Sequence, residues 1–343
     1  MKKIKHLFTV FVIILSLCGC TDSGRYEGNF NGCFKIFDCR VQNGILVYTD
    51  AGMNEFLNYE NMQTIPLCTK PDCTHTKDSD CFGFGKETGE FIHNNKLYWF
   101  VQSGRYEDDE FYPILKFMQS DVTGYNEINL VEIEGYIFEN AALPCVINDN
   151  TLYFTPYKQE DDNREIHLSK IDLDSYRFTD IAIIGEDCGN LKGIFDDKVY
   201  FYEMYFDLKN NCFGEEKFQK NGHKFKIYDN YLMYDKDGDI IILNENKDKL
   251  IIKNEEMTDF VTIEDDILFC TTPNSSPYYI DLKNEELIRT EFESLSPEDD
   301  FFVYDSYKDS YIIYVAKIAF DEETGGNTWN INYEKISKSS VIK

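Results

Sequence analysis

The stretch NNKLYWF (Asn94–Phe100) decides the fold, because two turn-forming asparagines stand directly before a run of strand-forming residues. Asparagine tolerates the left-handed backbone of a tight turn, whereas leucine and aromatic residues favour a strand that is buried on at least one face. A turn that leads at once into a short apolar run is typical of a β-hairpin. The stretch therefore predicts a tight turn and the strand that follows it in an antiparallel sheet.

The same signature recurs along the whole chain. Each copy has an Asn- or Asp-rich turn followed by a strand of aliphatic and aromatic residues. The other copies are NGILVY (Asn43–Tyr48), DNTLYF (Asp149–Phe154), DDKVYFY (Asp196–Tyr202), DNYLMY (Asp229–Tyr234), DDILFC (Asp265–Cys270) and DSYIIY (Asp309–Tyr314). Aligned on the second strand residue, the copies fall at Leu46, Leu97, Leu152, Val199, Leu232, Leu268 and Ile312, with steps of 51, 55, 47, 33, 36 and 44 residues.

A period of about 40 to 50 residues made of short strands and turns is the length of one propeller blade with four antiparallel strands. One such sheet cannot bury both faces alone, whereas blades stacked around a ring bury them against one another. We therefore predict an all-β fold, a β-propeller over residues 33–343, with seven blades favoured. Six blades stay open, because the steps of 33 and 36 residues could hide an incomplete blade. A β-sandwich with a second β domain gives no reason for the repeated signature.

The two ends of the predicted ring carry candidate closing strands. WNINYEKI (Trp329–Ile336) is placed to pair with an N-terminal strand such as Phe34–Arg40. Such a pairing would seal two exposed strand edges and close the ring.

The N-terminus, MKKIKHLFTVFVIILSLCGC, has the layout of an export signal, with three lysines, an apolar run and small residues before Cys20. The apolar run from Leu7 to Leu17 is shorter than the ~20 residues of a membrane-spanning helix. Leu17-Cys18-Gly19-Cys20 resembles the bacterial lipobox. On this resemblance, residues 1–19 form a lipoprotein signal peptide, Cys20 receives acyl chains such as palmitate, and residues 20–32 form a tether. The alternative is a plain secreted protein that is cut nearby.

The chain is strongly acidic, with 34 basic against 62 acidic residues and a formal charge of −28. Removal of residues 1–19 takes away three lysines, which leaves 31 against 62, or −31. Phosphate backbones and anionic lipid surfaces repel such a chain, so nucleic-acid binding is excluded. Apolar residues make up 43% and aromatic residues 15% of the chain, which is ample material for a folded core.

Four metal-type ligands gather in IPLCTKPDCTHTKDSDC (Ile65–Cys81), in the predicted connection between the first two blades: Cys68, Cys73, His75 and Cys81. Three Cys and one His form a standard ligand set of structural zinc, although the spacing from Cys68 to Cys73 is wider than in a standard finger. In an oxidising exterior the same thiols can form disulfides, with Cys68 bonded to Cys73 or Cys81. Structural zinc and disulfides both stay open.

Together, the lipobox, the turn-strand repeats and the Cys-x4-Cys-x-His-x5-Cys cluster resemble the β-propeller lipoproteins of low-GC Gram-positive bacteria, which are similar to the propeller of the Tol system. The residues that carry this resemblance are Cys20 and Cys68, Pro71, Cys73, His75 and Cys81. Because that family has no established reaction, the resemblance implies a fold and a cell-surface location rather than an activity.

No motif in the sequence nominates a catalytic residue. DKDGD (Asp235–Asp239) and GGNTW (Gly325–Trp329) are interpreted as hairpin turns, and His93, His167 and His223 as surface or channel-lining residues in separate repeats. We therefore expect a monomeric module, held on the extracytoplasmic face of the cell membrane by a lipid at Cys20, that binds a protein, peptide or glycan. The alternative is a glycan-processing propeller enzyme, which would need a pair of carboxylates in its funnel.

Overall fold

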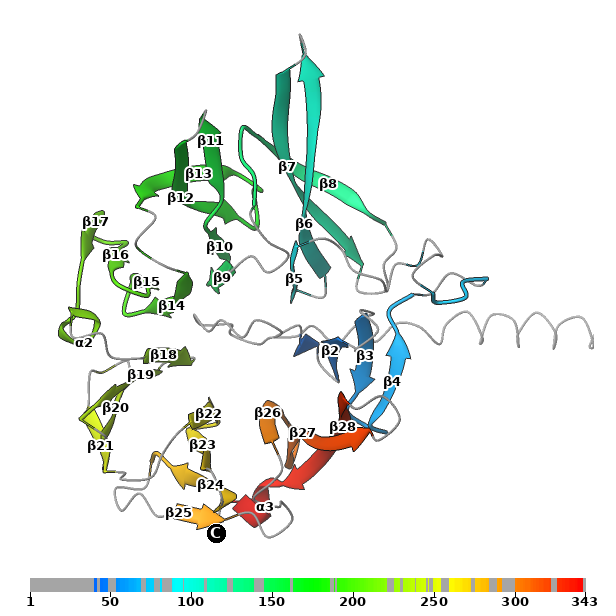
Figure 1. The fold of residues 1–343 in the computed structure, drawn as a ribbon, viewed down its shortest axis with the longest axis vertical. Helices are drawn as coiled ribbons and strands as arrows, with labels where there is room; N and C mark the ends of the chain where they lie inside the picture. The colour runs from blue at the N-terminus through cyan, green and yellow to red at the C-terminus, as the bar shows by residue number, and fades with distance from the viewer. Residues whose placement is uncertain are drawn as a thin grey trace, which may run out of the picture.

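The computed structural model confirms the all-β propeller with seven blades (Figure 1). It describes residues 40–41, 44–48, 54–68, 72–76, 81, 88–94, 96–107, 110–121, 126–138, 145–160, 163–185, 188, 190–220, 225–228, 231–237, 239–244, 246, 249–253, 259–272, 275–283, 289–291, 300–321 and 326–341. The predicted signal peptide, Cys20 and the tether lie outside these residues. Among the described helices, none is long and apolar enough to cross a membrane.

The first three blades are antiparallel sheets built from consecutive strands. Blade 1 holds β1 (Arg40–Val41), β2 (Gly44–Tyr48), β3 (Asn54–Asn58) and β4 (Gln63–Pro66). Blade 2 holds β5 (Thr88–His93), β6 (Lys96–Glu107), β7 (Glu110–Asp121) and β8 (Ile128–Glu134). Blade 3 holds β9 (Cys145–Asn148), β10 (Thr151–Phe154), β11 (Tyr157–Glu160), β12 (Asn163–Asp172) and β13 (Phe178–Ile184).

The last four blades complete the ring. Blade 4 holds β14 (Leu191–Phe195), β15 (Lys198–Phe201), β16 (Tyr205–Asp207) and β17 (Cys212–Gly214), followed by α2 (Lys217–Lys220). Blade 5 holds β18 (Phe225–Tyr228), β19 (Tyr231–Lys236), β20 (Asp239–Leu243) and β21 (Lys249–Lys253). Blade 6 holds β22 (Asp259–Glu264), β23 (Ile267–Thr272), β24 (Ser275–Asp281) and β25 (Arg289–Glu291). Blade 7 holds β26 (Asp300–Tyr307), β27 (Ser310–Asp321) and β28 (Gly326–Ser337), followed by α3 (Lys338–Val341).

The repeated signature forms the same element in every blade, namely the second strand. The preceding turns use the left-handed backbone that short polar side chains tolerate, with φ of 49° at Asn94, 50° at Asp149 and 50° at Asp265. The strands themselves enter the core, since Leu97, Val199 and Ile312 are at most 1% exposed. The residue chemistry of the signature thus sets both the turn and the buried strand.

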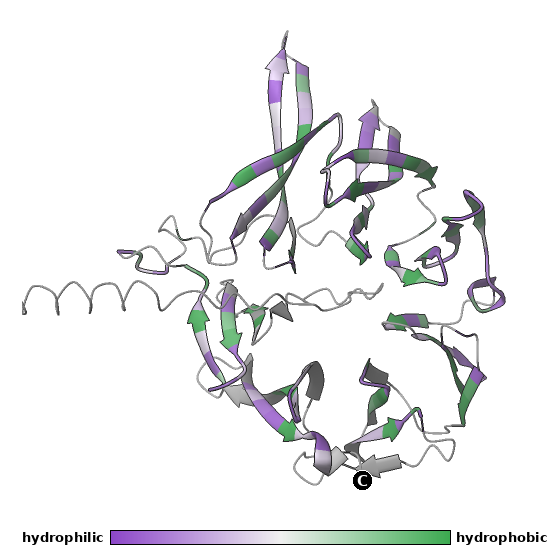
Figure 2. Ribbon diagram, turned by 180° about the vertical axis from the view of Figure 1, so that it is seen from behind, coloured by the Kyte–Doolittle hydropathy of each residue, from purple (hydrophilic) through white to green (hydrophobic). Residues whose placement is uncertain are grey.

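Hydrophobic clusters join each blade to the next around the ring. The shared residues are Phe100 with Phe154 between blades 2 and 3, Leu168 with Val199 between blades 3 and 4, Tyr200 with Phe225 between blades 4 and 5, Met233 with Leu268 between blades 5 and 6, Phe269 with Tyr311 between blades 6 and 7, and Ile312 with Ile45 between blades 7 and 1. Figure 2 shows hydrophilic and hydrophobic residues interspersed along the strands of the blades. The apolar faces of the sheets are therefore buried against the neighbouring blades, and this burial holds the ring together.

Two blades differ in strand number from the prediction of four. Blade 3 carries an extra strand, β11, which pairs with β12 beside β10. Blade 7 has three strands in the part of the chain that the structure describes. The short steps of 33 and 36 residues do not correspond to an incomplete blade, because blades 4 and 5 have four strands each. Strands β16 and β17 of blade 4 are only 3 residues long.

The predicted closing pair is absent from the described strands. β28 pairs with β27 along its full length, and Arg40 in β1 pairs with Ile45 in β2, inside blade 1. The remainder of the predicted N-terminal strand, residues 34–39, lies outside the described residues. Among described residues, side-chain packing between blades 7 and 1 is what joins the two ends of the ring.

Candidate metal centre

The Cys and His cluster begins directly where the outermost strand of blade 1 ends. β4 stops at Pro66, and the backbone N–H of Cys68 donates to the Pro66 carbonyl over 2.8 Å, which turns the chain inward. Leu67 and Cys68 are then buried, at 5% and 8% exposure. The cluster therefore lies in the connection from blade 1 to blade 2, as the sequence predicts.

The structure brings all four predicted ligands together. One ligand atom each from Cys68, Cys73, His75 and Cys81 lies within 4.8 Å of every other. His75 Nδ1 is 3.5 Å from Cys81 Sγ, and the backbone N–H of His75 donates to Cys73 Sγ over 3.4 Å. A left-handed backbone at His75, with φ of 51°, turns its imidazole back toward the sulfur atoms.

These distances fit a tetrahedral zinc site. Zinc–sulfur bonds of ~2.3 Å and zinc–nitrogen bonds of ~2.0 Å place neighbouring ligand atoms about 3.5 to 3.8 Å apart. The 3.5 Å separation of His75 Nδ1 and Cys81 Sγ falls in that range. A pair at the 4.8 Å limit of the cluster would close by about 1 Å on binding zinc. The hydrogen bond from the His75 backbone to Cys73 is of the kind that orients a metal-bound thiolate.

The surroundings of the cluster are apolar. Cys68 and Cys81 belong to the same hydrophobic cluster as Leu67, Trp99 and Phe117, and Cys73 packs against it. Thiolates buried in such surroundings need a compensating charge, because an unpaired buried anion is strongly disfavoured. A divalent cation bound by the three sulfurs would supply that charge.

The remaining described cysteines lie apart from this centre. Cys145 is buried in β9, and burial raises the pKa of its thiol to about 12, so it stays protonated as a small apolar core residue. Cys212 is exposed at the start of β17. Cys33 and Cys39 lie outside the described residues. Among the groups that the structure describes, the Cys68 cluster alone brings three or more metal-type ligands together.

The histidines outside the cluster occupy positions that the sequence did not predict. His93 and His167 were expected on the surface or lining the channel, but they are buried, at 7% and 2% exposure. His93 Nε2 lies 2.7 Å from Asn150 Oδ1, and His167 Nδ1 lies 2.9 Å from Asp180 Oδ2. The expectation was wrong because polar partners on adjacent strands and turns allow an imidazole to be buried. His223 lies outside the described residues.

The structure describes the two segments interpreted as hairpin turns only in part. Asp235–Lys236 and Asp239 belong to β19 and β20, which pair as a hairpin, and Asp237 has a left-handed backbone with φ of 56°. In the second segment, residues 326–329 form the start of β28 and pair with β27 up to Asp321. Residues 322–325 lie outside the described residues.

Comparisons with known proteins support the fold. No protein-family model matches the chain, and no curated protein matches it. An oligogalacturonate lyase solved in complex with manganese has 12% identity over 93% of this chain and 91% of that chain, with a TM-score of 0.51. The periplasmic gluconolactonase of Pseudomonas aeruginosa has 8% identity over 85% and 98% of the two chains, with a TM-score of 0.43. At 12% identity the likeness to the lyase shows the propeller fold alone.

Proposed function

We propose that this protein is a lipid-anchored extracytoplasmic propeller that acts as a binding or scaffold module and carries one structural zinc ion. The observation that supports the proposal is the convergence of four protein ligands at one point. A zinc ion with four protein ligands has no open position for water or substrate, so it holds structure rather than performing chemistry. The zinc would fix the connection between blades 1 and 2. It would thereby hold these two blades at a constant distance from each other.

The lipid anchor follows from the sequence pattern at Leu17-Cys18-Gly19-Cys20 and from the resemblance to propeller lipoproteins of low-GC Gram-positive bacteria. Acyl chains at Cys20 would hold the ring near a membrane, since each buried methylene contributes ~0.8 kcal/mol. The partners would then be molecules outside the cytoplasm: a protein, a peptide or a glycan.

Metal analysis tests the zinc. The full chain, purified without chelator under reducing conditions, is expected to contain about one equivalent of zinc. Cys73→Ser and His75→Ala should lose most of it, whereas Cys212→Ser, which changes an exposed cysteine away from the cluster, should keep it. Absence of zinc together with a mapped disulfide among Cys68, Cys73 and Cys81 would reject the metal site.

Metabolic labelling tests the anchor. The full chain, expressed in a Gram-positive host fed an alkyne-bearing palmitate analogue, should carry the label and sediment with membranes. Cys20→Ala should lose both properties, while Cys18→Ala, a control in the same segment, should keep the label. An unlabelled protein in the culture medium would instead indicate a plain secreted protein.

A second function is favoured by the likeness to the oligogalacturonate lyase, which covers nearly the whole of both chains. Under this alternative the ring would process a glycan. Incubation of the full chain with oligogalacturonate and manganese, with product followed by ultraviolet absorbance of the unsaturated sugar, distinguishes the two. Turnover would show that the protein is an enzyme rather than a binding module. Absence of turnover would reject oligogalacturonate, the one glycan that the comparison suggests, as its substrate.

A further inference from the structure

The second blade carries a hairpin that extends past the rim of the ring (Figure 1). β6 and β7 are each 12 residues long and pair without interruption from Lys96 and Asp121 to Glu107 and Glu110. The inner halves are buried, but residues 104–107 and 110–112 are exposed. We call residues 102–107 and 110–113 the arm. Six extended residues span ~20 Å, so the arm stands well clear of the core.

One face of the arm is aromatic. Tyr106 and Phe111 are directly opposite each other on the two strands, with ring centroids 5.3 Å apart. Their exposures are 77% and 50%, although most large aromatic side chains of the described blades are buried. A Cβ on Gly104 would lie 2.3 Å from the Phe111 ring, so that ring lies flat over Gly104. Aromatic residues held open to solvent in this way are typical of binding surfaces rather than of ordinary protein surface.

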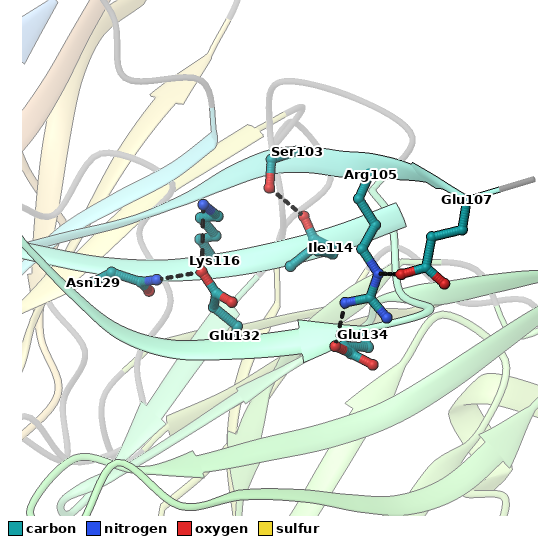
Figure 3. A network of polar contacts seen from close by, with 8 residues as sticks. All are labelled: Ser103, Arg105, Glu107, Ile114, Lys116, Asn129, Glu132 and Glu134. Carbon is teal, nitrogen blue, oxygen red and sulfur yellow. Dashed lines mark hydrogen bonds and ion pairs between the residues drawn. The ribbon is translucent and has the colours of Figure 1, made fainter. Parts of the chain in front are cut away.

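The other face of the arm and its base are charged (Figure 3). Arg105 pairs with Glu107 and with Glu134 of β8, each over 2.7 Å, and Lys116 pairs with Glu132 over 3.3 Å. Glu110 accepts a hydrogen bond from the Tyr112 hydroxyl over 2.9 Å.

Negative charge is concentrated near the end of the arm. Glu107 and Glu110 are directly opposite each other, and like charges at such a position destabilise a strand pair. The described arm and the strand beside it therefore present exposed aromatic rings on one face. On the opposite face, the carboxylates of Glu107, Glu110 and Glu134 outnumber the single guanidinium of Arg105.

We propose that the arm is the docking site for a cationic polypeptide segment, rich in lysine or arginine. Such side chains have an aliphatic stem that packs on aromatic rings and a cationic head that is attracted both to ring faces and to carboxylates. A second copy of this chain does not fit, because two acidic arms repel each other, and an anionic surface is repelled for the same reason. The proposal rests on the proposed function as a binding module and specifies the class of its partner.

Binding of defined probes to the full chain in detergent tests the arm. The probes are a fluorescent peptide of six Lys-Gly repeats, a matched peptide of six Glu-Gly repeats and maltohexaose. Two variants remove the proposed contacts: Tyr106→Ser with Phe111→Ser, and Glu107→Gln with Glu110→Gln. The matched controls change an exposed ring and exposed carboxylates of blade 4: Tyr202→Ser, and Glu203→Gln with Glu215→Gln.

The cationic peptide should bind the unaltered chain, and each arm variant should weaken that binding about 10-fold. The controls should change it less than about 2-fold, which separates a local site from general attraction to an acidic protein. All variants should keep their melting temperature, since the altered side chains are exposed.

Equal weakening by arm and control variants, or no peptide binding at all, overturns the arm as a cationic docking site. Maltohexaose binding that only the arm variants lose overturns it in favour of a glycan. Neither result bears on the anchor or on the zinc. The proposed function fails separately, by turnover of oligogalacturonate or by an unaltered chain that carries no palmitate label.

Discussion

Single buried residues connect neighbouring blades through polar contacts. His93, in the inner strand of blade 2, contacts Asn150 in the signature turn of blade 3. Burial lowers the pKa of His93, while the hydrogen bond to Asn150 and the charge of Asp174 partly oppose this shift. Burial therefore favours the neutral form of His93 in the folded ring, against the opposing effect of its contact with blade 3.

At this scale we predict a pH effect. Below the unfolded pKa of about 6.5, the unfolded chain binds a proton at His93 that the folded chain resists, so stability falls as the pH drops from 7 to 5. His93→Gln keeps a hydrogen-bonding group but does not titrate, and should show a smaller fall in melting temperature over that range. Parallel pH profiles of the two proteins by thermal denaturation check this. Identical slopes for His93→Gln and the unaltered chain would contradict it.

Single elements in this ring depend on close approach between blades. β14 of blade 4 carries a bulge between Leu191 and Gly193, and Gly193 has a φ of 155° that side chains rarely adopt. A Cβ at Gly193 would lie 3.0 Å from the Cβ of Ile227, in β18 of blade 5. The glycine therefore allows the two inner strands to lie against each other.

For this element we predict that Gly193→Ala destabilises the protein by about 1 to 3 kcal/mol, through backbone strain and crowding against Ile227. Gly185→Ala is the matched control, because a Cβ there meets nothing within 4 Å. Chemical denaturation of both variants gives the free energies of unfolding. Equal effects of the two glycine substitutions would contradict the packing argument.

The whole molecule is a ring whose ends meet between blades 7 and 1. Ile312 of β27 is fully buried against Ile45, Val47 and Leu57 of blade 1. Outside this apolar contact, Glu60 accepts hydrogen bonds from Lys308 over 3.0 Å and from Tyr307 over 3.3 Å. Among the described strands these side chains, not a shared sheet, close the ring.

At this largest scale we predict that Ile312→Ala loosens the closure. The substitution removes a fully buried side chain and should lower the free energy of unfolding by about 3 kcal/mol. Hydrogen exchange, followed by mass spectrometry, should rise in blades 1 and 7 and stay unchanged in blade 4. Ile242→Ala, an equally buried change in blade 5, is the control and should not raise exchange in blade 1. Uniform exchange changes in both variants would show that the closure is not a separate weak point.

The sequence predicted the elements that local chemistry specifies. Asn and Asp at the turns and aliphatic or aromatic residues after them were enough to place the second strand of all seven blades. The four candidate metal ligands could also be recognised in the sequence, because they lie within fourteen residues of one another. The extra strand β11, the buried positions of His93 and His167 and the exposed rings of the arm were missed. Each of these depends on neighbours that lie far away along the chain.

By itself, the sequence determined the blades and the position of the Cys and His cluster, because turn preference and the burial of strands act between residues close along the chain. Only the tertiary structure decided that the four ligand atoms converge, that blade 7 meets blade 1 through Ile312, and that the arm projects from blade 2. Convergence and closure depend on how sheets stack. Stacking depends on side-chain shape across blades, which no local pattern encodes.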